Sequence, residues 1–188
     1  MAMFYALMAL CLSGSSLAQV ISSGGCPDVQ VQENFNITRN MGRWYEQARF
    51  YTLFEVGSDC GFFDYVYGAN NTTKVVSTGR SVLTGLKRII EVEVIIPDPE
   101  QPAKLLVKIP MSPVKLYDNL WALGSDYDNW TVFFSCTVVD ATNVQYAWIL
   151  TRAQVPDDSI LASAYAVLTK NKIDTSRLMR SEQKRCPK

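Results

Sequence analysis

Short runs of alternating apolar and polar residues fill the chain from residue 43 to residue 151. In the clearest run, Val92 and Val94 share one face while Glu91 and Glu93 share the other, as in a half-buried strand. Eight runs predict eight β-strands, at residues 43–54, 61–67, 73–78, 86–96, 104–109, 116–124, 130–138 and 145–151. Short strands joined by turns are typical of an antiparallel sandwich or barrel.

One amphipathic helix is predicted after the strands. Pro156, Asp157 and Asp158 favour a helix start, because proline suits the first turn and acids suit the positive end of the helix dipole. Lys170 and Asn171 favour its end. One apolar stripe lies between them, formed by Ile160, Leu161, Ala164, Val167 and Leu168. We expect this stripe to pack on the outside of the sheet, since a membrane-surface helix would want a more basic polar face.

The first 18 residues predict a signal peptide. They carry no charge, they contain an apolar run from Met3 to Leu12, and Ser16 and Ala18 fit the small-residue rule for cleavage. The apolar run is too short for a transmembrane helix, which needs roughly 20 apolar residues. We therefore expect a secreted, extracellular protein with one domain over residues 19–188 and no transmembrane segment.

Composition excludes several function classes. Lys and Arg number 18 and Asp and Glu number 18, so there is no surplus of positive charge for nucleic-acid binding. The absence of histidine removes the Ser-His-Asp triad, the Cys-His dyad and every His-ligated metal site. With no CxxC motif either, no metal site is expected.

Cysteines and glycosylation motifs agree with secretion. Four cysteines remain after residue 18, and four cysteines allow three pairings. Asn-x-Ser/Thr motifs occur at Asn36, Asn70, Asn71 and Asn129. Asn70 and Asn71 overlap, so we expect at most one of the two to be glycosylated.

Three motifs, in order, resemble the three signature regions of the lipocalin family. Gly42-Arg43-Trp44 opens the first strand, Ser125-Asp126-Tyr127 lies in the turn before the seventh, and Arg152 ends the eighth. The second motif is usually Thr-Asp-Tyr, and Ser125 keeps the hydroxyl of that threonine. With the ending Lys184–Pro187, the chain resembles the apolipoprotein D-like group, which includes bilin-binding insect lipocalins and crustacyanin subunits.

The resemblance implies an eight-stranded antiparallel up-and-down barrel with one C-terminal helix packed outside. Trp44 would plug its closed end, with Gly42 allowing a close backbone approach and Arg152 lying over the indole. Asp126 and Tyr127 are interpreted as turn-capping residues rather than catalytic ones. The resemblance also implies the disulfides Cys26–Cys136 and Cys60–Cys186.

Ligand-contacting positions follow partly from the resemblance and partly from strand parity. The resemblance places Tyr65 and Trp148 in the ligand pocket. Parity adds Phe63, Tyr67, Tyr146, Ile90, Val92, Val94, Leu105, Val107 and Ile109. The alternative is that some of these side chains simply fill the barrel. The inner face of strand 130–138 stays open, because Trp130, Val132 and Phe134 compete with Phe133.

The sequence therefore predicts a secreted carrier of a small hydrophobic ligand: a retinoid, fatty acid, sterol, bilin or carotenoid. No cofactor is required, although a bilin, carotenoid or lipid could be bound. One alternative is a subunit of a pigment-protein assembly of the crustacyanin type, homo- or hetero-oligomeric, for which an exposed Trp121 would provide contacts. The other is a lipocalin-type isomerase, which needs a free reactive cysteine. We expect no enzyme, because all four cysteines should be paired.

Overall fold

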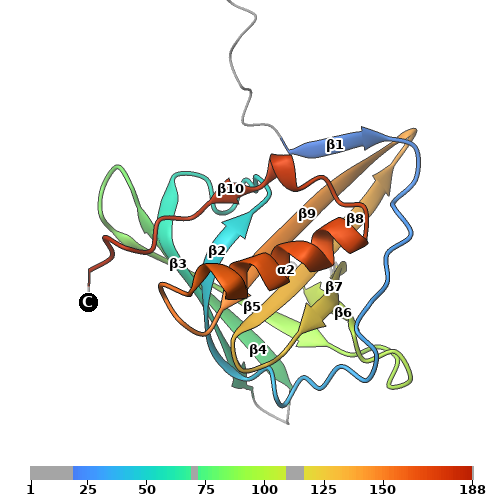
Figure 1. Ribbon diagram of the computed structural model, residues 1–188, viewed down its shortest axis with the longest axis horizontal. Coiled ribbons are helices and arrows are strands. Elements are labelled where there is room, and N and C mark those ends of the chain that lie inside the picture. Colours follow the sequence, from blue (N-terminus) through green and yellow to red (C-terminus); the bar gives the residue numbers. More distant parts are fainter. Residues whose placement is uncertain (1–18, 69–71, 109–116, 188) are drawn as a thin grey trace, which may run out of the picture.

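An antiparallel sheet closes on itself to form a barrel in the computed structural model, which describes residues 19–68, 72–108 and 117–187 (Figure 1). Within these residues eight consecutive strands run in order, and β9 pairs with β2 to close the barrel. The strands are β2 (Gly42–Arg49), β3 (Ser58–Tyr67), β4 (Thr73–Ser81), β5 (Lys87–Ile95), β6 (Lys104–Lys108), β7 (Tyr117–Ser125), β8 (Trp130–Val139) and β9 (Thr142–Thr151). The predicted eight-stranded antiparallel up-and-down barrel is confirmed. The predicted signal peptide and the predictions for Asn70, Asn71 and Ile109 fall outside the described residues.

The first predicted strand ends five residues too late. β2 stops at Arg49, and the chain then turns through residues 50–57, with the N–H of Glu55 bonded to the carbonyl of Thr52. The pairing of β2 with β3 ends at Tyr45. Beyond Arg49 the chain therefore has no neighbouring barrel strand on that side with which to form backbone hydrogen bonds. We refer to residues 50–57 as the 50–57 segment.

Two short strands were not predicted. β1 (Val20–Ser23) pairs with β9, and β10 (Met179–Arg180) pairs with β2. A run of two to four residues is too short to show a period, and both pairings join the ends of the chain to distant strands. A short 3₁₀ helix, η3 (Thr175–Arg177), precedes β10.

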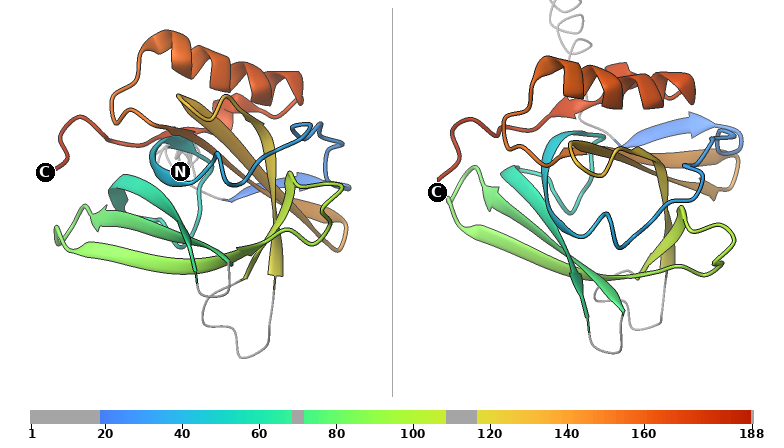
Figure 2. Two further views of the ribbon diagram at one scale, coloured as in Figure 1. Left: turned by 90° about the horizontal axis from the view of Figure 1, so that it is seen from below. Right: turned by 60° about the horizontal axis from the view of Figure 1, so that its bottom comes forward.

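The predicted helix is α2 (Asp158–Lys170), and it packs on the outside of the barrel over β7 and β8 (Figure 2). Ala164 and Leu168 of its apolar stripe are fully buried. They contact an outer apolar cluster that includes Val132, Phe134 and Ile149. Within the described residues no helix is long and apolar enough to cross a membrane.

A second apolar cluster fills the inside of the barrel. It contains Trp44, Tyr65, Leu105, Phe133 and Leu150, each at most 3% exposed. Phe133 is therefore the inward residue of β8, while its neighbours face α2. This assigns the inner face that the sequence pattern left open.

Two disulfides tie the ends of the chain to the barrel. Cys26 is bonded to Cys136 on β8, and Cys60 on β3 is bonded to Cys186. This is the pairing that the family resemblance implied. The sequence separations are 110 and 126 residues, so each bond joins segments that are far apart along the chain.

Candidate functional site

The closed end of the barrel is built around Trp44, which is 0% exposed. Its indole N–H donates to the carbonyl of Asn40 at 2.8 Å, and the guanidinium of Arg152 lies 3.7 Å from the ring centroid. Gly42 has a φ of +93°, and a Cβ there would lie 3.3 Å from an Arg152 nitrogen. The guanidinium of Arg152 also donates to the carbonyls of Tyr127, Arg43 and Arg39. Gly42, Trp44 and Arg152 therefore stabilise the closed end of the barrel.

Asp126 caps the turn between β7 and β8. Its Oδ1 accepts from the backbone N–H groups of Asp128, Asn129 and Trp130. Burial acts to raise the pKa of Asp126, but these hydrogen bonds outweigh it and hold the pKa below its ordinary value. The hydroxyl of Tyr127 accepts from the N–H of Asn36, which ties the segment before β2 to the same turn. Asp126 thus caps this turn, and Tyr127 links the turn to Asn36.

Tyr65 lies deep in the barrel, 3% exposed, with its ring stacked on Phe133 at 6.0 Å between centroids. Burial raises the pKa of its phenol. Most other positions chosen by parity also pack in the inner cluster, fully or partly buried: Phe63, Val92, Val94, Leu105 and Val107. Ile90 lines a small cavity toward the other end of the barrel.

Tyr67 does not fit the parity prediction, because its side chain is 60% exposed. It shares a strand face with Tyr65, but Tyr65 already pairs with Gly42, the first residue of β2. Tyr67 therefore extends beyond the neighbouring strand, and nothing from β2 covers it. Trp121 departs from its prediction in the opposite sense: it is partly buried against the outer cluster rather than exposed.

Trp148 lies between two aromatic rings. Its indole stacks on Tyr146 at 6.0 Å and on Phe54 of the 50–57 segment at 6.5 Å. The hydroxyl of Tyr146 accepts from the side chain of Gln19. Trp148 belongs to the inner cluster, so the predicted aromatic pair of Tyr65 and Trp148 shares the inside of the barrel.

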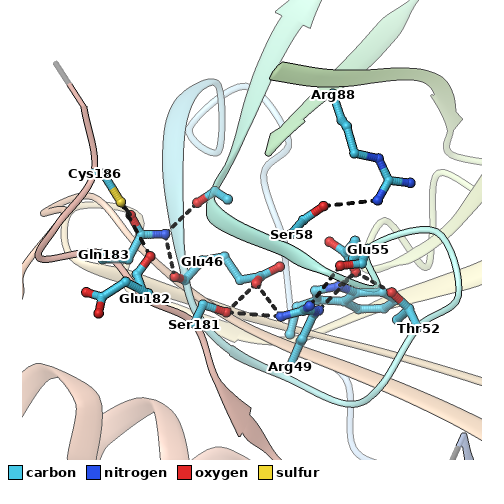
Figure 3. Close-up of polar contacts among 12 residues, drawn as sticks. Glu46, Arg49, Thr52, Glu55, Ser58, Arg88, Ser181, Glu182, Gln183 and Cys186 are labelled. Atoms are coloured by element: carbon cyan, nitrogen blue, oxygen red, sulfur yellow. Dashed lines mark hydrogen bonds and ion pairs between the residues drawn. The ribbon is translucent and has the colours of Figure 1, made fainter. Parts of the chain in front are cut away.

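A buried polar cluster near Trp148 was missed by the sequence reasoning (Figure 3). Arg49 donates to Glu46 at 2.9 Å and to the backbone carbonyl of Glu55 at 3.1 Å. The Oε2 atom of Glu55 accepts from the hydroxyl of Thr52 at 2.7 Å and from the indole N–H of Trp148 at 3.2 Å. The side chain of Glu46 also accepts from the hydroxyl of Ser181. We call Glu46, Arg49 and Glu55 the buried ionic cluster.

Arg88 of β5 holds the 50–57 segment from the opposite wall. Its guanidinium donates to the carbonyls of Phe54 at 3.1 Å and Val56 at 3.0 Å, and to the hydroxyl of Ser58 at 3.1 Å. The cavity between the segment and the wall has a volume of about 20 Å³, enough for a water molecule but not for a lipid. It is lined by the buried ionic cluster with Phe54, Ser58, Gly61, Ser77, Thr78, Gly79, Arg88 and Ile90.

The charge state of Glu55 depends on its burial. Burial and the neighbouring charge of Glu46 raise the pKa of Glu55 from 4.5 to about 8, against the opposing effects of Thr52 and Arg49. Because the pKa is higher in the closed segment than in water, the proton stabilises the closed position. That stabilisation is complete below pH 4.5 and is lost as the pH rises through about 8.

We expect the 50–57 segment to loosen as the pH rises. When Glu55 ionises, its charge lies in a buried site beside the charge of Glu46, while Arg49 is already paired with Glu46 and Arg88 is the other nearby cation. This arrangement destabilises the closed position of the segment. Hydrogen exchange of the segment's amides, corrected for the intrinsic rate, should show weaker protection at about pH 9 than at about pH 6. In Glu55→Gln this pH dependence should vanish. Equal pH dependence in both proteins would contradict the assignment to Glu55.

No group of three or more potential metal ligands of the Cys, Asp, Glu or His type occurs among the residues that the structure describes. The site is thus an apolar, aromatic barrel interior with one ionic cluster under the 50–57 segment.

Comparisons with known proteins agree with this architecture. The sequence profile of the Lipocalin / cytosolic fatty-acid binding protein family matches residues 41–185. Apolipoprotein D of Cavia porcellus is 33% identical over 171 residues, covering 90% of this chain and 88% of that protein. Bilin-binding protein of Pieris brassicae is 24% identical over 151 residues, covering 79% and 78%.

Among solved structures, insecticyanin from Manduca sexta superposes with a TM-score of 0.77 at 23% identity, covering 88% of this chain and 89% of that one. That likeness shows the shared fold. Together with the profile match and the plugged barrel, it identifies the chain as a member of the lipocalin family.

Proposed function

We propose that the protein is a secreted carrier that holds one small hydrophobic molecule inside the barrel. The observation that carries this proposal is the aromatic lining between Tyr65 near the closed end and Trp148 near the 50–57 segment. Apolar pockets with a few polar groups are typical of small-molecule sites. The similarity to apolipoprotein D and to a bilin-binding protein supports a lipid or pigment as the ligand.

The carrier proposal is favoured over the two alternatives. Isomerase activity would need a free thiol, and the four cysteines among residues 19–187 are paired in two disulfides. The contact expected from Trp121 in a pigment-protein assembly is weakened, because the indole packs on the protein's own outer cluster and Lys104 lies over its ring.

Secretion and glycosylation are part of the same proposal. Disulfides persist in oxidising compartments, which supports removal of residues 1–18 and export. Asn36 and Asn129 are both exposed, but the amide of Asn129 donates to Asp126 at 2.9 Å. We therefore propose Asn36 as the more accessible glycan acceptor of the two.

We expect retinoid or bilin binding to quench tryptophan fluorescence, with saturation near one ligand per chain. An indole packed against a bound conjugated molecule loses emission, and Trp148 lines the proposed pocket. Trp148→Phe should fold normally, because a smaller aromatic still fills the wall, and should lose most of the quenching.

Trp121→Phe is the matched control, because Trp121 contacts the outer cluster rather than the barrel interior. Its quenching should equal that of the unmodified protein. If Trp148→Phe is quenched as fully as the control and binds as tightly, the ligand does not contact Trp148 and the pocket lies elsewhere.

A further inference from the structure

The 50–57 segment occupies the place where the proposed ligand would contact Trp148. Phe54 stacks on the indole, and Glu55 accepts its N–H. The cavity between the segment and the barrel wall is about 20 Å³, far smaller than a lipid. A hydrophobic ligand must therefore displace Phe54 and Glu55 before it reaches this end of the pocket.

Displacement of the segment removes partners from two buried or half-buried arginines. Arg49 loses the carbonyl of Glu55 and the nearby carboxylate, whose Oε2 lies 3.6 Å from its Nε. Arg88 loses the carbonyls of Phe54 and Val56, two of its three acceptors. Both arginines stay behind, because they belong to β2 and β5 of the barrel wall.

The charges of the site show what would replace the segment. Below about pH 8 the closed segment holds Glu55 protonated, so the single negative charge of Glu46 faces the two positive charges of Arg49 and Arg88. Among the described residues, Arg88 forms no ion pair within 4.0 Å, whereas Arg49 is already paired with Glu46. The site therefore carries one unbalanced positive charge. When the segment swings into water, Arg88 also loses the two carbonyls that accept its hydrogen bonds, and an unpaired charge away from water is costly.

We propose that the barrel selects hydrophobic ligands that carry one carboxylate, and that this carboxylate replaces Glu55 against Arg49, Arg88 and the indole N–H of Trp148. The inference rests on the proposed carrier function and adds the chemical class of the ligand. The acid group lies under the displaced segment, and the apolar body extends toward Tyr65 and the plug. Glu55 thus acts as a built-in competitor for the ligand's head group.

Guanidinium groups suit this exchange. They bind carboxylates with two parallel hydrogen bonds, which are stronger than bonds to a neutral hydroxyl. An alcohol of the same shape could accept the indole N–H but would leave the positive charge unbalanced. The competitor is also easily displaced, because burial and Glu46 disfavour the charged form of Glu55.

Retinoic acid and retinol provide the test, since they share an apolar body and differ in the head group. Titrations at neutral pH, read by tryptophan quenching, should give at least tenfold tighter binding for the acid. In Arg88→Gln the ratio of the two affinities should fall close to one, because this variant lacks the guanidinium that binds the carboxylate. Arg43→Gln is the matched control, because Arg43 is a half-exposed arginine paired with Asp64 away from the cavity, and it should keep the full preference.

Glu55→Gln tests the competitor directly. It keeps the shape of the side chain and mimics its protonated form, which stabilises the closed segment. At neutral pH both retinoids should therefore bind several-fold more weakly to this variant, while the preference for the acid is kept. Unchanged or tighter acid binding in this variant would overturn the exchange.

The remaining outcomes separate the two proposals. Equal affinities of the unmodified protein for acid and alcohol, or an equal loss of both in Arg88→Gln, would overturn the carboxylate preference and leave the carrier function standing. If neither retinoid nor a bilin binds, the carrier function itself fails and this inference fails with it.

Discussion

Trp44→Ala should lower the free energy of unfolding by about 3–5 kcal/mol, the usual cost of removing a large buried aromatic side chain. Trp44 is 0% exposed, and its loss would leave a cavity at the closed end and free the carbonyl of Asn40. The ring that Arg152 covers at 3.7 Å would be lost as well. Urea denaturation followed by far-ultraviolet circular dichroism measures the change.

Trp121→Ala is the control for this prediction, because it removes the same side chain from a partly buried position on the outer cluster. Its effect on the free energy of unfolding should be clearly smaller.

Arg152→Ala should also destabilise the folded protein, with the cation–π contact contributing about 0.5–2 kcal/mol. For both Trp44→Ala and Arg152→Ala, ligand affinity per folded molecule should change much less than stability. An unchanged unfolding transition in Trp44→Ala would show that the indole does not plug the barrel.

The buried ionic cluster shows where strand parity stops being informative. Strict alternation from Trp44 predicts Glu46 and Ala48 on the inner face. The structure has a bulge at Gln47 in the pairing with β9, so Ala48 lies in the outer cluster while Arg49 contacts Glu46 and Glu55. A bulge inserts one unpaired residue without changing the apolar pattern, so the sequence does not reveal it.

The position of Glu55 could not be predicted from the sequence for a different reason. It follows the aromatic run that ends at Phe54, which alternation extends as a strand. Where that strand ends depends on where its neighbours stop, and β3 begins only at Ser58. By contrast, Trp44 and Arg152 could be located from the sequence, because their motifs come with a fixed place in the family's barrel.

Removal of the Cys60–Cys186 disulfide, in Cys60→Ser with Cys186→Ser, should lower the free energy of unfolding by about 2–5 kcal/mol. The bond closes a loop between residues 126 apart in sequence, so its loss frees much of the unfolded chain. The tail would keep some order, because Gln183 donates to the carbonyls of Glu46 and Gly61.

The single variant Cys60→Ser tests the pairing itself. It should free the thiol of Cys186 and leave the Cys26–Cys136 bond intact, because that bond joins the segment before β2 to β8. Peptide mapping under non-reducing conditions should recover Cys26 linked to Cys136 from both the variant and the unmodified protein. Recovery of a Cys26–Cys60 peptide from the unmodified protein would overturn the pairing.

Because β10 and the tail contact β2 beside Glu46, loss of the Cys60–Cys186 bond should also weaken protection of the 50–57 segment in hydrogen exchange.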